Sequence, residues 1–256
     1  MKSMLIAVGT SLIIASPAFA QDVSEDGWTG EGSLSAGTTT GNTETTDLGI
    51  GVNAARKVGL WTTGVELVAD YGELDGIESR NRYFLAGQVD RDLSEKLYAF
   101  GRTSYEVDEF SGFESRTFVG GGLGYHIFKG DTLAWSVEGG PGFKIDEVRP
   151  FAAVLDETGA VVTPAIEGMT EESVAFIGAS DYSYAFNDNV TFTNTTSILY
   201  AQESTQIGNV VAITAALSDA LSARFSFDVR HDTNPPMGFE DTDTATRISL
   251  VYALGG

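Results

Sequence analysis

The stretch from Arg82 to Val107, RYFLAGQVDRDLSEKLYAFGRTSYEV, carries the pattern that decides the fold. Apolar and mixed polar residues alternate through two arms, and the polar turn Asp92–Lys96 separates the arms. A period of two places successive side chains on opposite faces, so the stretch predicts a β-hairpin with one apolar and one mixed polar face. Each arm has about 10 residues, which is the length that a tilted strand needs to cross a bilayer.

The first twenty residues have the pattern of a secretory signal peptide. Lys2 is the positively charged start, an apolar run follows, and Ala18-Phe19-Ala20 is a cleavage site of the A-x-A type. The apolar run is too short for a spanning helix. We therefore expect residues 1–20 to be removed, residues 21–27 to form a short periplasmic leader, and residues 28–254 to form one domain.

Composition excludes several classes of protein. The formal net charge of −21 argues against a nucleic-acid partner, because surfaces that bind nucleic acid are basic. The chain has no cysteine, which removes disulfides, thiolate metal sites and a lipid-anchored N-terminal cysteine. Its length suits one large all-β domain.

The rest of the chain repeats the hairpin pattern. We expect twelve strands, near residues 28–37, 45–56, 60–71, 80–91, 97–107, 115–128, 132–145, 173–186, 190–201, 208–217, 221–231 and 244–254. Five short connections alternate with six mostly longer ones. An even number of strands, with short turns at one end and longer loops at the other, is typical of outer-membrane barrels and places both termini on the periplasmic side.

Periodicity alone leaves open a soluble barrel with an apolar interior, or a secreted β-sandwich or solenoid. Two observations favour a membrane barrel. The charges of the polar phase are plausible in a wet lumen and expensive against lipid. The large aromatic residues of the apolar phase form two girdles, as lipid interfaces select. One girdle holds Trp28, Trp61, Tyr125, Trp135, Phe186 and Tyr252, and the other holds Tyr71, Tyr83, Tyr105 and Tyr200. The predicted fold is an all-β, transmembrane, antiparallel up-and-down barrel of about 12 strands.

Several small motifs also resemble those of a known family. They are Trp28, Gly41-Asn42-Thr43, Trp61, Asp90-Arg-Asp-Leu93, Gly120-Gly-Gly-Leu-Gly-Tyr125 and Gly139-Gly-Pro-Gly142. Over most of residues 28–254 the chain resembles the YdiY-like salt-induced outer-membrane proteins, also catalogued as a domain of unknown function. The resemblance implies an outer-membrane location and, through the family name, a link to salt or osmotic stress. It implies no biochemical activity and carries over no catalytic residue. The loop 146–172 is longer than the usual connection of that family.

Charged residues of the polar phase are the candidate site. They are Glu66, Asp70, Arg82, Asp90, Arg102, Glu106, Arg116, Glu138, Asp181, Arg224, Asp228, Arg230 and Arg247, together with Glu31 and Asp47. One interpretation is a pore whose charged lining selects solutes, with a mild preference for cations. The other is that these groups pair across strands and fill a narrow lumen. We expect Arg82 and Arg102 to pair with Glu66 and Asp70.

The sequence offers no catalytic, cofactor or metal motif. His126 and His231 are expected at opposite ends of the barrel, so they are interpreted as lone polar residues. The expected outer loops are acidic and include Asp108, Asp146 and Asp232. Their carboxylates suit weak divalent-cation binding, although an ordinary solvated surface explains them as well.

The predicted function is a structural or narrow-channel barrel of the outer membrane. The alternatives are a solute-specific porin and an outer-membrane lipid-modifying enzyme. The amphipathic last strand, 244–254, is typical of barrels that the outer-membrane assembly machinery inserts. Expected partners are therefore that machinery and outer-membrane lipid.

Overall fold

The computed structural model describes residues 27–254 apart from 41–44, 75–76, 156–158, 160, 164, 166 and 236–238. The predicted signal peptide and residues 21–26 of the predicted leader lie outside the described residues, and so does the Gly41-Asn42-Thr43 motif. Gly27 belongs to the first strand rather than to a leader. Among the residues that are described, no helix is long and apolar enough to cross a membrane.

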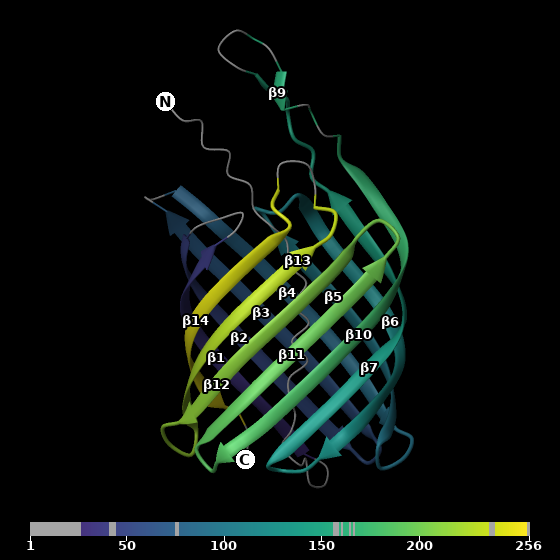
Figure 1. Ribbon diagram of the computed structural model, residues 1–256, viewed down its shortest axis with the longest axis vertical. Coiled ribbons are helices and arrows are strands. Elements are labelled where there is room, and N and C mark those ends of the chain that lie inside the picture. The colour runs from purple at the N-terminus through teal and green to yellow at the C-terminus, as the bar shows by residue number, and fades with distance from the viewer. Residues whose placement is uncertain are drawn as a thin grey trace.

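Twelve long antiparallel strands close into a single barrel (Figure 1). They are β1 (Gly27–Thr40), β2 (Thr45–Val58), β3 (Trp61–Leu74), β4 (Ile77–Asp92), β5 (Leu97–Asp108), β6 (Phe113–Lys129), β7 (Leu133–Val148), β10 (Met169–Asn187), β11 (Val190–Ala201), β12 (Thr205–Ala216), β13 (Leu221–Asp232) and β14 (Thr242–Ala253). Each strand pairs with the next along the chain, and β1 pairs with β14 to close the sheet. Closure leaves no unpaired sheet edge. The predicted twelve-strand barrel is confirmed.

The hairpin that decided the prediction is present as β4 and β5. Leu85 lies opposite Tyr105, and Gly87 lies opposite Thr103. The backbone N–H groups of Leu93 and Ser94 both donate to the carbonyl oxygen of Leu97. These bonds close the tight turn that the polar residues predict.

Strand ends differ from the prediction at the end of the barrel that carries the longer connections, here called the long-loop end. There β10 begins at Met169 rather than 173, and β12 begins at Thr205 rather than 208. The residues that extend these strands are mostly polar on both faces. The hydrophobic alternation therefore ends before the backbone pairing does. Within the longest connection, β8 (Val154–Leu155) and β9 (Val161–Thr163) form a small separate hairpin, which the sequence did not predict. Figure 1 shows β9 beyond the barrel rim.

The outer surface of the barrel is apolar. Leu67, near the middle of β3, is 45% exposed, and Ile248 on β14 is 66% exposed. All the predicted girdle residues except Trp135 are also among the exposed large side chains. Trp135 is half-buried, because its ring packs near Phe128 and Tyr182 and its Nε1 donates to Ser180 Oγ at 3.0 Å. The exposed outer face is therefore apolar and the buried inner face carries the charges, which is the reverse of a soluble barrel, as predicted.

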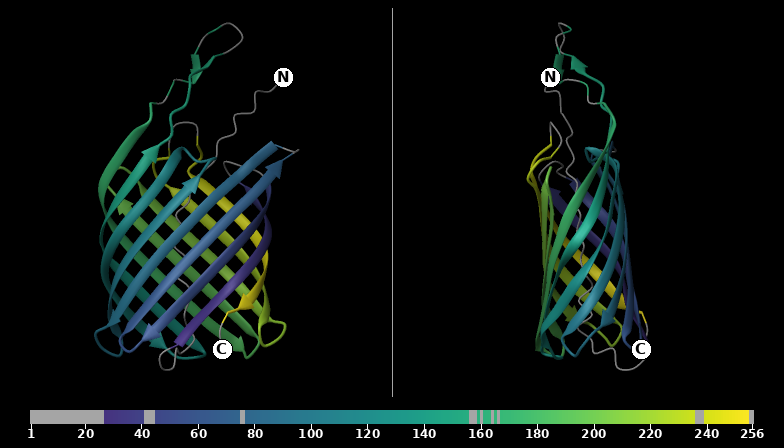
Figure 2. Two further views of the ribbon diagram at one scale, coloured as in Figure 1. Left: turned by 180° about the vertical axis from the view of Figure 1, so that it is seen from behind. Right: turned by 90° about the vertical axis from the view of Figure 1, so that its right-hand side faces the viewer.

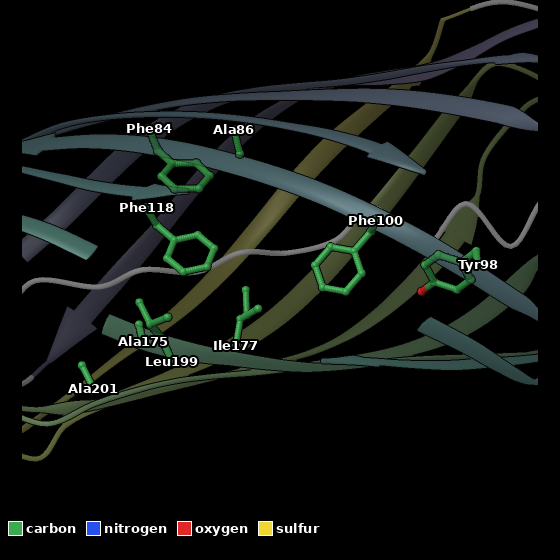
Figure 3. Packing of buried hydrophobic residues seen from close by; sticks show 9 residues of the cluster. All are labelled: Phe84, Ala86, Tyr98, Phe100, Phe118, Ala175, Ile177, Leu199 and Ala201. Carbon is green, nitrogen blue, oxygen red and sulfur yellow. The ribbon is translucent and has the colours of Figure 1, made fainter. Parts of the chain in front are cut away.

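The barrel is flattened, being wide in Figure 1 and much thinner when turned by 90° in Figure 2. The wall of β4, β5 and β6 therefore approaches the wall of β10 and β11. Phe84 and Phe118 from the first wall join Ile177 and Leu199 from the second in one buried apolar cluster (Figure 3). The sequence predicted a mixed polar interior, so this apolar cluster is an unpredicted part of the lumen.

Candidate functional site

The charged residues of the polar phase lie inside the barrel, while the residues between them on the same strands face outward. On β3, for example, buried Glu66 and Asp70 flank exposed Leu67. The interior has three parts. They are an ion-pair network toward the long-loop end, the apolar cluster, and a cavity at the opposite end, here called the short-turn end.

Arg82 is the most enclosed cation of the network, with 2% of its surface exposed. Its Nε donates to Glu106 Oε1 at 2.7 Å, and its Nη1 donates to Asp70 Oδ2 at 3.1 Å. Register explains both contacts, since β3 places Asp70 directly opposite Arg82 and β5 places Glu106 opposite Phe84. Two carboxylates on the strands that flank β4 therefore hold one guanidinium group.

The network continues across the seam where β14 meets β1. Arg247 on β14 lies 3.3 Å from Asp228 on β13, 3.5 Å from Asp47 on β2 and 3.9 Å from Asp70 on β3. Arg230 also contacts Asp228, at 3.5 Å. Charges from both sides of the seam thus lie in one connected cluster.

Arg80 is a member that the sequence prediction missed. It contacts Asp47 at 3.7 Å and Asp70 at 3.5 Å. Arg80 and Arg82 are two residues apart on β4, so both side chains face inward. This alternation could have predicted the position of Arg80 from the sequence. The predicted strand began at Arg80, and the predicted lumen charges did not include this first residue.

Arg116 connects opposite walls of the barrel. Its Nη2 lies 3.2 Å from Asp146 Oδ2 on β7 and 3.3 Å from Asp232 Oδ2 on β13. Four strands separate β6 from β13 on the shorter way around the barrel, so the second contact crosses the lumen. Gln206 on β12 lies within hydrogen-bonding distance of the same guanidinium, and Lys144 contacts Asp146 at 2.8 Å.

These contacts correct the prediction for three acidic residues. Asp108, Asp146 and Asp232 were expected in outer loops, yet all three are buried at strand ends. The strands extend past the predicted boundaries, and the inward phase carries these carboxylates into the lumen. Asp146 and Asp232 there accept hydrogen bonds from Arg116.

Toward the short-turn end, Glu138 on β7 is the central acceptor. Its Oε1 accepts from Arg102 Nη1 at 3.1 Å, and its Oε2 accepts from Tyr98 Oη at 3.2 Å and from Gln88 Nε2 at 3.2 Å. Gln88 Nε2 also donates to Asp90 Oδ1 at 2.9 Å. Near the same end, Arg224 binds Glu31 through two hydrogen bonds of 2.7 and 2.8 Å, with both side chains partly exposed.

The predicted pairing of Glu66 with Arg82 or Arg102 is not present as an ion pair, although the charges of both arginines act on Glu66. Register places Glu66 opposite Ala86, four residues from Arg82, while Arg102 is held by Glu138. Of the predicted acceptors, Asp70 does pair with Arg82, and Glu66 forms no ion pair with any described residue.

A cavity of 740 Å³ occupies the short-turn half of the lumen. Glu66, Asp90, Glu138 and Asp181 lie in its wall, beside Tyr98 and His126. The rings of Tyr98 and His126 pack with centroids 4.9 Å apart. His231 lies near the opposite end of the barrel, with Nδ1 2.9 Å from Thr242 Oγ1. In the described part of the chain, no three carboxylate or imidazole groups are grouped closely enough to hold a metal ion.

The comparison with family models places the chain. The model described as "Protein of unknown function, DUF481" matches residues 32–254. The chain belongs to the DUF481 family. A curated relative of this DUF481 protein is the uncharacterized protein YdiY of Escherichia coli strain K12, which is 24% identical over 232 residues, covering 88% of this chain and 83% of YdiY. The predicted YdiY-like resemblance is confirmed.

Solved structures with the same fold are outer-membrane barrels. The DUF481 chain matches the NanC porin with a TM-score of 0.54 and 12% identity, over 87% of this chain and all of that one. It matches an outer-membrane channel from Pseudomonas putida F1 with a TM-score of 0.56 and 10% identity, over 94% and 100% of the two chains. The translocator domain of the autotransporter NalP from Neisseria meningitidis gives 0.54 and 15%, over 90% of each. At these identities the likeness shows a shared fold.

Proposed function

We propose that this DUF481 barrel lies in the outer membrane and forms a narrow channel whose long-loop half is closed by ion pairs. The contact of Arg116 with Asp232 carries the proposal, because it joins opposite walls across the lumen. The apolar cluster narrows the same lumen, because residues of β4 and β6 pack there against residues of β10 and β11. A wide aqueous pore would keep such groups apart and hydrated.

The outward surface supports the location. Apolar side chains cover the barrel, and aromatic residues lie near both ends of the strands, as in barrels that contact lipid. Outer-membrane lipid is then the main partner, and the outer-membrane assembly machinery inserts the chain after its signal peptide is removed. The proposal assigns no enzymatic activity. The link to salt or osmotic stress remains a prediction from the resemblance.

The channel proposal is tested by conductance. Refolded wild-type protein in planar bilayers is expected to give small currents. Arg116→Ala removes the bridge between β6 and β13, so its single-channel current is expected to rise several-fold. Arg224→Ala is the matched control, because Arg224 also faces inward but binds Glu31 two strands away around the wall. A large wild-type current that Arg116→Ala leaves unchanged would contradict the closed lumen and favour the solute-specific porin.

The orientation in the membrane gives a second test. Because the chain has no native cysteine, a thiol reagent will label only the introduced residue. Cysteine at Asp241, beside the long-loop end of β14, should react with an impermeant thiol reagent on intact cells. Cysteine at Gly130 or Asp219, in short turns, should react only after the cells are opened. The reverse pattern of labelling would invert the orientation. Asp156 is the equivalent position in the longest loop and lies outside the described residues.

A further inference from the structure

The short-turn cavity contains a buried carboxyl group that belongs to no ion pair of the described residues. Glu66 is 7% exposed and lines the cavity, yet its Oε2 accepts no hydrogen bond. Glu66 forms no ion pair with any described residue. The neighbouring Glu138 differs, since it accepts from Arg102, Tyr98 and Gln88. The ionised form of a carboxyl group that is buried outside any ion pair is strongly unfavourable, so a cation from outside the chain would stabilise the charge at this position.

A second carboxylate of the cavity is in a similar position. Asp90 accepts a hydrogen bond from the neutral amide of Gln88 and contacts no Lys or Arg of the described chain. Seven carboxylates and only four Lys or Arg side chains line the cavity as a whole. The cavity is therefore an environment of negative charge, in contrast to the balanced network above it.

The spacing of the two carboxylates selects the shape of the cation. Register places Glu66 opposite Ala86, and Asp90 lies four residues further along β4. At the rise of an extended strand, their backbones are about 14 Å apart. One metal ion cannot contact both, and no three or more Asp, Glu or His side chains of the described residues are close enough together to hold a metal ion. An extended cation with charges at its two ends can.

The wall between the two carboxylates carries small side chains beside the amide of Gln88. Gly64 on β3 contributes no side chain, and Ala86 on β4 contributes one methyl group. The Tyr98 ring lies over Gly124, where a Cβ atom would come within 2.0 Å of the ring, so Tyr98 is held in place beside the cavity. An aliphatic chain fits over such a surface, and an aromatic ring also attracts an ammonium group.

We propose that the short-turn cavity binds a linear aliphatic polyamine, with one ammonium group at Glu66 and another at Asp90. This goes beyond the channel function, because equilibrium binding to the cavity does not require that the lumen conducts. The polyamine would enter from the side of the short turns, whose residues Glu95, Lys96 and Asp131 form the rim.

Isothermal titration of the refolded barrel in detergent, at low ionic strength, tests the proposal. Spermidine is the main probe, and putrescine, butylamine and magnesium chloride are the comparisons. Spermidine is expected to bind more tightly than putrescine, and butylamine and magnesium much more weakly. Glu66→Gln and Asp90→Asn should each weaken spermidine binding by at least about tenfold, since each removes a hydrogen bond to a charged group.

Asp219→Asn is the matched control. It removes one carboxylate from an exposed short turn outside the cavity, so it changes the net charge equally and should leave the affinity unchanged. Gel mobility shows which variants are folded, and two separate cavity variants guard against the loss of one. Three results would overturn the site: no spermidine binding by the wild type, equal binding of butylamine, or an equal loss of affinity in Asp219→Asn.

Discussion

Replacing Arg82 with alanine is expected to lower the free energy of unfolding by about 3–5 kcal/mol, because it leaves buried Glu106 without its counter-ion and removes the nearest cation from buried Asp70. Glu106 and Asp70 lie 2.7 and 3.1 Å from the guanidinium and are themselves buried. The measurement is the urea midpoint of the barrel refolded in lipid vesicles. The fraction folded can be followed by gel mobility.

Arg224→Ala provides the comparison for Arg82→Ala. Arg224 also forms two short hydrogen bonds to a carboxylate, yet its side chain is 28% exposed and that of Glu31 is 30% exposed. Water screens such a pair, so its loss should cost about 1 kcal/mol or less. Similar losses for the two variants would mean that the Arg82 site is hydrated, as in a wide pore. Replacing Arg82 and Glu106 together with leucine should recover part of the loss, since no charge of that pair is left unmatched.

Leu67→Arg is the second variant with a large expected effect. Leu67 faces outward near the middle of β3, between Val52 and Leu85 on the neighbouring strands. An arginine on the lipid side at mid-membrane costs roughly 2–4 kcal/mol, measured by the same urea titration in vesicles. Glu66→Gln, on the opposite face one residue away, should be mild.

Thr63→Arg is the matched control for Leu67→Arg. Thr63 faces outward on the same strand but lies close to its short-turn end. The same substitution there should cost about 0–1 kcal/mol, because the penalty decreases toward the membrane interface. If all three variants lose equal stability, the outward face does not contact lipid.

The sequence was sufficient for the fold because strand phase is a local property. The alternation through residues 82–107 gives both the hairpin and the direction of its side chains, so Arg82, Arg102 and Glu106 were placed inside before any pairing was known. Strand ends were less accurate. Asp108, Asp146 and Asp232 follow the inward phase, yet a carboxylate after the last apolar residue looks the same in a strand as in a loop.

The choice of partners within the lumen was harder to predict, because it depends on register and on barrel shape. The turn between β3 and β4 fixes which residue lies opposite Arg82. A register change of four residues would place Glu66 there in place of Asp70. The contact of Arg116 with Asp232 joins residues 116 positions apart on strands that are not neighbours. Hydrophobic alternation does not indicate such a contact. It also does not indicate that Phe118 and Ile177 belong to the same buried cluster.

The oval outline of the barrel has a geometric consequence. Twelve strands joined edge to edge form a loop of nearly fixed perimeter, and such a loop encloses the largest area when it is circular. The oval therefore reduces the cross-section of the lumen without breaking any backbone hydrogen bond. The same sheet can enlarge its opening by becoming rounder, with side-chain contacts such as that of Arg116 as the opposing force. In this barrel the bore is set by the roundness of the sheet as well as by its number of strands.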